Sequence, residues 1–143
     1  MNTYNGGPRE ANRKTAIIVG VLFIVGTVAG SLSIVFTAPI LDNPDYLVIV
    51  SANENQIIIG ALLVLIMGLA LALVPVMMFP IVKKQNEALA LGYVVFRGGL
   101  ETVTSIAFVS SLLLLIPLSL EYVKAGAPDA SCFQNLSVLL YRI

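Results

Sequence analysis

Three long runs of apolar residues, separated by short polar segments, make up most of the sequence. They cover about residues 16–38, 57–82 and 88–120, and each exceeds the roughly 20 residues that a helix needs to cross the ~30 Å hydrocarbon core of a bilayer. The apolar stretch of a signal peptide is shorter, so the first run is interpreted as a membrane anchor. The pattern predicts an all-α membrane protein with three antiparallel transmembrane helices in a single helical domain, residues 15–143.

The polar segments between and beside these runs are expected to lie at the membrane surfaces. Residues 1–14 are polar and basic and predict a cytoplasmic tail. Asn43 and Pro44 fit the cap and first position of a short interfacial helix before the second run, with a plain loop as the alternative. Residues 130–143 are too short to span a bilayer, and their apolar side chains recur at helical spacing. An amphipathic surface helix is therefore predicted at the C-terminus.

Basic residues are concentrated at one end of the predicted bundle. The tail and the turn between the second and third runs carry Arg9, Arg13, Lys14, Lys83 and Lys84. Lysine and arginine are enriched on the cytoplasmic side of membrane proteins. We therefore expect a multi-pass protein of the cell (inner) membrane with its N-terminus in the cytoplasm.

The composition excludes several classes of function. Apolar residues make up 58% of the chain and charged residues 11%, whereas soluble domains carry roughly 25% charged residues. There is no histidine and one cysteine, Cys132, so imidazole ligation and paired-cysteine sites are excluded, and no metal or cofactor is expected. No basic run is typical of nucleic-acid binding. The expected partners are the lipid bilayer and either a second copy of the chain or another membrane protein.

The third run contains the one group of polar residues that suggests a site. Tyr93, Arg97, Glu101 and Ser105 recur at intervals of four and are predicted to share one helix face. A charge near the bilayer centre costs about 2.5–3.5 kcal/mol, so this face should meet protein or water rather than lipid. Two interpretations stay open. The pair orders the bundle as an internal ion pair, or Arg97 binds an anionic lipid or ligand with Glu101 as its counter-ion or proton carrier.

Small residues at intervals of four form the second feature. They are Gly26 and Gly30 in the first run, Gly68 and Ala72 in the second, and Gly98 in the third. Such spacing lets membrane helices approach closely. We expect these residues to pack helices within the chain, with a homodimer face as the alternative.

Four segments together are similar to a known family. They are RKTA at 13–16, NENQ at 53–56, Tyr93-x3-Arg97-x3-Glu101, and the segment 121–129. The chain resembles a domain-of-unknown-function family of bacterial multi-span integral membrane proteins. The resemblance implies no activity, and it implies further spans after a segment like 130–143, so the chain is expected to be truncated relative to the family.

Two function classes follow. No nucleophile stands beside a base in a recognisable arrangement, so a non-enzymatic structural or interaction protein of the membrane is expected. The alternative is a transporter-like or anionic ligand-binding protein that uses Arg97 and Glu101.

Overall fold

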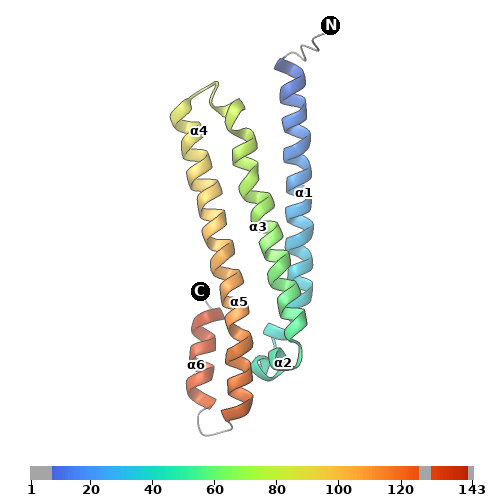
Figure 1. The fold of residues 1–143 in the computed structure, drawn as a ribbon, viewed down its shortest axis with the longest axis vertical. Coiled ribbons are helices and arrows are strands. Elements are labelled where there is room, and N and C mark those ends of the chain that lie inside the picture. The colour runs from blue at the N-terminus through green and yellow to red at the C-terminus, as the bar shows by residue number, and fades with distance from the viewer. Residues whose placement is uncertain (1–7, 126–129, 142–143) are drawn as a thin grey trace.

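The computed structural model describes residues 8–125 and 130–141, and within these ranges the chain is helical with short turns and no strand (Figure 1). The all-α prediction is confirmed. The elements are α1 (Pro8–Leu41), α2 (Tyr46–Ala52), α3 (Glu54–Val82), α4 (Glu87–Tyr93), the π-helical η1 (Val94–Gly99), α5 (Leu100–Ala125) and α6 (Ala130–Tyr141).

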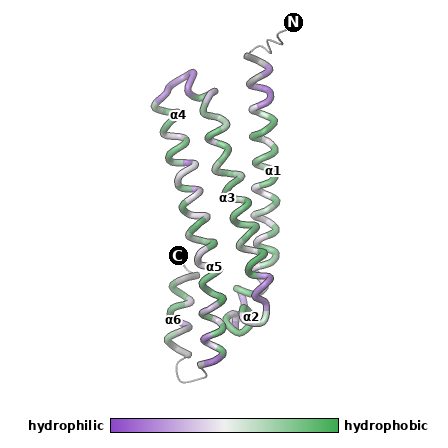
Figure 2. The backbone as a smooth tube through the Cα atoms, viewed as in Figure 1, coloured by the Kyte–Doolittle hydropathy of each residue, from purple (hydrophilic) through white to green (hydrophobic). Residues whose placement is uncertain are grey.

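Three helical stretches are long and apolar enough to cross a membrane: Asn12–Leu41, Glu54–Val82 and Glu87–Lys124. Large apolar side chains cover their outer surfaces, among them Phe96, which is 71% exposed. Water-soluble proteins rarely expose apolar surface on this scale. Figure 2 shows hydrophobic residues along the long helices and hydrophilic residues toward several of their ends. The protein is therefore a multi-pass membrane protein.

Helix α1 is longer than the first apolar run. It starts at Pro8, so residues 8–14 are helical where the sequence predicted a tail, and it continues through Pro39 to Leu41. Proline is tolerated in the first turn of a helix, where its missing N–H has no partner to lose. Carbonyl groups near the other end find donors: the Asp42 N–H donates to the Ala38 oxygen at 2.9 Å, and Gln56 Nε2 donates to the Phe36 oxygen at 2.9 Å.

The bundle places α3 between α1 and α5 (Figure 1). The contacts between α1 and α3 join residues whose numbers add up to 97: Gly26–Leu71, Gly30–Met67 and Thr37–Gly60. The two helices are therefore antiparallel, and continuing the register places Lys14 level with Lys83. Within the described residues, α1 and α5 have no Cα atoms within 8 Å of each other.

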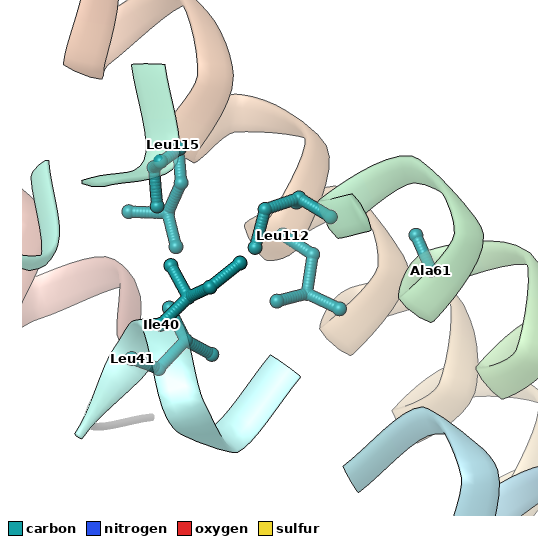
Figure 3. Packing of buried hydrophobic residues seen from close by; sticks show 7 residues of the cluster. Ile40, Leu41, Ala61, Leu112 and Leu115 are labelled. Atoms are coloured by element: carbon teal, nitrogen blue, oxygen red, sulfur yellow. The ribbon is translucent and has the colours of Figure 1, made fainter. Parts of the chain in front are cut away.

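Helix α2 closes one end of the bundle. A short helix is present here rather than a plain loop, but it is capped by Asp45 and starts at Tyr46 instead of at Pro44, because the Asn43 side chain accepts a hydrogen bond from the Asp45 N–H and holds a turn there. Val50 of α2 is fully buried in a cluster with Ile40, Leu112 and Leu115 (Figure 3). This cluster links the ends of α1 and α5 through α2.

Helix α6 is the short helix predicted at the C-terminus. It runs back along the last turns of α5 rather than across the end of the bundle (Figure 1). Its buried Ser137 shares a hydrogen bond with the Tyr46 hydroxyl of α2, whereas Leu136 and Leu139 are exposed. The polar contact thus faces the protein, and these two leucines face the surroundings.

Candidate intramembrane polar site

The third span is interrupted by the π-helical turn η1, which carries Arg97. Turns with i→i+5 hydrogen bonds are rare, and they occur most often inside α-helices at functional sites. Gly98 of this turn is buried against α3: a Cβ placed there would lie 3.3 Å from Cγ of Pro75 and 3.5 Å from the Ala72 oxygen. A side chain at Gly98 would therefore require the ring of Pro75 to shift by a few tenths of an ångström.

Arg97 and Glu101 form an ion pair across the end of this turn. Nη1 of Arg97 lies 3.3 Å from Oε2 of Glu101. The two side chains differ in exposure, at 49% for Arg97 and 17% for Glu101. The carboxylate is thus held toward the bundle, and the guanidinium reaches outward.

The four residues of the predicted face do not share one environment. Ser105 is buried against α3, where a Cβ on Gly68 would overlap its hydroxyl. Tyr93 is half-exposed and lines a hollow on the outer side of the third span with Arg97 and Glu101. The extra residue of the π turn offsets the faces before and after it, which the regular interval of four did not reveal. Glu101 borders both this outer hollow and a groove on the inner side of the third span.

The inner surface is a groove of about 530 Å³ between α1, α3 and α5, which we call the α1–α5 groove. Its floor includes Val64 and Met67 of α3, and Glu101 lies along one wall. Hydroxyl groups line both walls, from Ser33, Thr37, Thr104, Ser105 and Ser111. Several of these donate to helix carbonyls, as Thr37 does to the Ser33 oxygen at 2.9 Å. Such bonds satisfy the donors where no water is present.

The structure places all five predicted packing residues at contacts within the chain. A Cβ on Gly26 would lie 3.1 Å from Leu71 Cγ, and one on Gly30 would lie 2.6 Å from Met67 Sδ. Gly68 packs on Ser105, and Gly98 on Pro75 beside the Ala72 carbonyl.

Sequence reasoning missed the tightest of the α1–α3 contacts, at Gly60. A Cβ at this position would overlap Cγ2 of Thr37, and the Gly60 carbonyl oxygen accepts a 3.0 Å hydrogen bond from Ser33 Oγ. Gly60 faces α1 whereas Gly68 faces α5, so the spacing of the glycines carried no signal for this contact.

The arrangement offers two kinds of chemistry. On the outer side, Arg97 presents a guanidinium to an anionic group, and in the groove Glu101 and the hydroxyls present hydrogen-bonding partners to a polar group. Among the described residues, no cluster of three histidine, cysteine or acidic side chains is placed to hold a metal ion.

Comparison with known proteins gives one family. The model of DUF4386, a domain of unknown function, matches residues 18–142. Neither the curated proteins nor the solved structures gave a match to this chain.

Proposed function

Since the chain belongs to the DUF4386 family, whose description names no activity, we propose from the geometry that it is a non-enzymatic interaction protein of the membrane. It associates with a further membrane helix through the α1–α5 groove. The observation that carries this proposal is the position of Glu101, which lines a groove that the three spans leave open between α1 and α5.

The energetic reason is the cost of polar groups in lipid. An acidic side chain near the bilayer centre costs about 2.5–3.5 kcal/mol, and such residues normally face protein or water. A helix laid against the groove excludes lipid from Glu101 and from the hydroxyls around it. Hydrogen bonds between membrane helices contribute about 0.6 kcal/mol on average and up to about 1.7 kcal/mol, so one or two contacts to Glu101 give the association specificity.

The engagement of the polar groups favours packing over catalysis. Glu101 is paired with Arg97 at 3.3 Å. Thr104 Oγ1 donates to the Leu100 oxygen at 2.8 Å, and Ser111 Oγ to the Ala107 oxygen at 2.9 Å. A nucleophile or general base needs a free reactive group aimed at substrate, whereas these groups already serve the helix that carries them.

The orientation proposed for the bundle follows its basic end. Lys14 and Lys83 lie level in the register of α1 and α3, and Arg13 and Lys84 extend the same end. An excess of lysine and arginine on one side of a membrane protein favours the cytoplasmic side. We therefore place α2 on the outer side of the cell (inner) membrane.

Photo-cross-linking in intact cells tests the association. A photoreactive residue replaces Phe108, which lines the groove and is 45% exposed, or Val103, which is 66% exposed and does not line it. We expect a covalent membrane-protein adduct from position 108 and none from position 103. An adduct of twice the chain mass identifies a second copy, and another mass identifies a different membrane protein. Equal adducts at both positions, or none at 108, contradict the proposal.

A further inference from the structure

We propose that the outer surface around Arg97 binds the phosphate of an anionic phospholipid, and that an acyl chain of this lipid lies along the hollow beside it. The surface adjoins the α1–α5 groove at Glu101 and Thr104, which line both, but Tyr93, Phe96 and Arg97 line only the outer hollow. A failure of the lipid-binding proposal would therefore not contradict the proposed association of a helix with the groove.

The depth of Arg97 in the membrane supports a headgroup as its partner. The residue numbers of two contacts between α3 and the third span, Gly68–Ser105 and Pro75–Gly98, each add up to 173. The helices are therefore antiparallel in this register, which places Arg97 level with Val76. Val76 is seven residues from Lys83, or about 10 Å along a helix at 1.5 Å per residue. Long arginine side chains at such a depth extend toward the interface, where phosphate groups lie.

The direction of the third span favours the same reach. Helical side chains lean toward the N-terminus of their own helix, and for Arg97 this is the end at the turn with Lys83 and Lys84. The basic groups there attract anionic lipids at the membrane surface. The Cα–Cβ bond of Arg97 therefore points toward this basic end, and its Nη1 is paired with Glu101 one turn further along the helix.

The hydrogen-bonding capacity of Arg97 exceeds what its ion pair uses. A guanidinium carries five N–H donors, and even a bidentate carboxylate accepts from two of them. The side chain is 49% exposed on the outer side of the third span. Unsatisfied donors in hydrocarbon are costly, and a phosphate supplies several acceptor oxygens in a geometry that matches the guanidinium.

The hollow itself favours a lipid over free phosphate. It follows one side of the third span and is lined by apolar side chains, including Leu89, Phe96 and Leu100. Gly92 deepens it, since a Cβ at this position would meet nothing within 4 Å. Tyr93 and Arg97 supply polar groups in the same hollow. An inorganic ion would leave this apolar surface unused, whereas an acyl chain covers it.

Native mass spectrometry of the detergent-solubilised full chain tests the proposal. The protein is titrated with phosphatidylglycerol or with phosphatidylcholine of the same acyl chains. We expect the wild type to retain one phosphatidylglycerol in preference to phosphatidylcholine. Arg97→Gln should weaken the binding of phosphatidylglycerol about tenfold, as for the loss of a charge-assisted contact. Lys124→Gln, with the same charge change at an exposed site at the opposite end of the third span and outside the hollow, should keep the preference.

Two further variants change the charges around Arg97, and the second of them separates lipid binding from loss of fold. Glu101→Gln removes the competing carboxylate and should bind phosphatidylglycerol at least as tightly as the wild type. The double variant Arg97→Leu with Glu101→Leu carries no unpaired charge and should fold without the preference. Equal lipid binding by Arg97→Gln and Lys124→Gln, or retention of the preference in the double variant, would overturn the site. Displacement of the lipid by an equal concentration of inorganic phosphate would overturn the lipid assignment.

Discussion

Gly68 and Ser105 mark a contact at which α3 and α5 have no room for another atom. A Cβ on Gly68 would overlap both the Cβ and the hydroxyl of Ser105. Because lipid tails are as apolar as leucine, helices in a membrane are held by such close packing rather than by hydrophobic burial. The contact lies beside Glu101, four residues along the same helix, so it also fixes the position of that wall of the groove.

We predict that Gly68→Ala destabilises the bundle. Replacing a glycine inside a helix by alanine ordinarily stabilises the helix by about 1 kcal/mol. Here the new methyl group instead forces α3 and α5 apart. Gly92→Ala is the matched control, since a Cβ there would meet nothing within 4 Å. The melting temperature in detergent should fall for Gly68→Ala and stay level or rise for Gly92→Ala. Recovery in Gly68→Ala with Ser105→Gly would show that the side-chain overlap is the cause, and equal melting temperatures for both single variants would refute it.

We predict that Gly30→Leu loosens α1 from α3. A Cβ on Gly30 would lie 2.6 Å from Met67 Sδ, and a branched side chain needs much more space. The same substitution at Gly20, where a Cβ would meet nothing within 4 Å, should leave α1 in place. Protease resistance in detergent would then drop for the first variant alone, and equal resistance in the two would count against the packing claim.

Arg97 and Glu101 should behave as a coupled pair. Glu101→Gln leaves Arg97 without its counter-charge in a medium of low dielectric constant, and removing one member of a buried pair typically costs about 3–5 kcal/mol. Because Arg97 is half-exposed, the loss should fall below about 3 kcal/mol. The double variant Arg97→Leu with Glu101→Leu should be more stable than Glu101→Gln alone. Thermal stability of both single variants and the double variant measures the coupling, and additive losses would show that the residues do not interact.

Cysteine labelling tests the orientation proposed for the bundle. In a Cys132→Ser background, a cysteine at Asn43 should react with an impermeant thiol reagent added outside intact cells. A cysteine at Gln85, in the turn at the basic end, should be protected until the cells are opened. Both positions are exposed in the structure, so a difference reports the side of the membrane. Labelling of Gln85→Cys in intact cells would reverse the topology.

The three spans could be predicted from the sequence because their length and apolar content are set by the bilayer. The ends of α1 could not, since the apolar pattern that marks a span does not extend over residues 8–14, which continue the helix. The interval of four from Tyr93 to Ser105 predicted a shared face, but the π turn η1 separates Tyr93 from Ser105, and hydrophobicity carries no signal for an extra residue per turn. The predicted pairing of Arg97 with Glu101 is formed. The groove between α1 and α5 could not be read from the chain, because it depends on which helix lies in the middle.

The measurement that tests the central claim most directly is photo-cross-linking from position 108 in a variant whose α1–α5 groove is filled by a large side chain. Ser111→Trp places a large side chain at a position that lines the α1–α5 groove, whereas Val103→Trp places the same side chain outside the groove. The account predicts that Ser111→Trp abolishes the adduct and that Val103→Trp leaves it unchanged. An adduct that persists in Ser111→Trp would show that the partner helix does not occupy the groove.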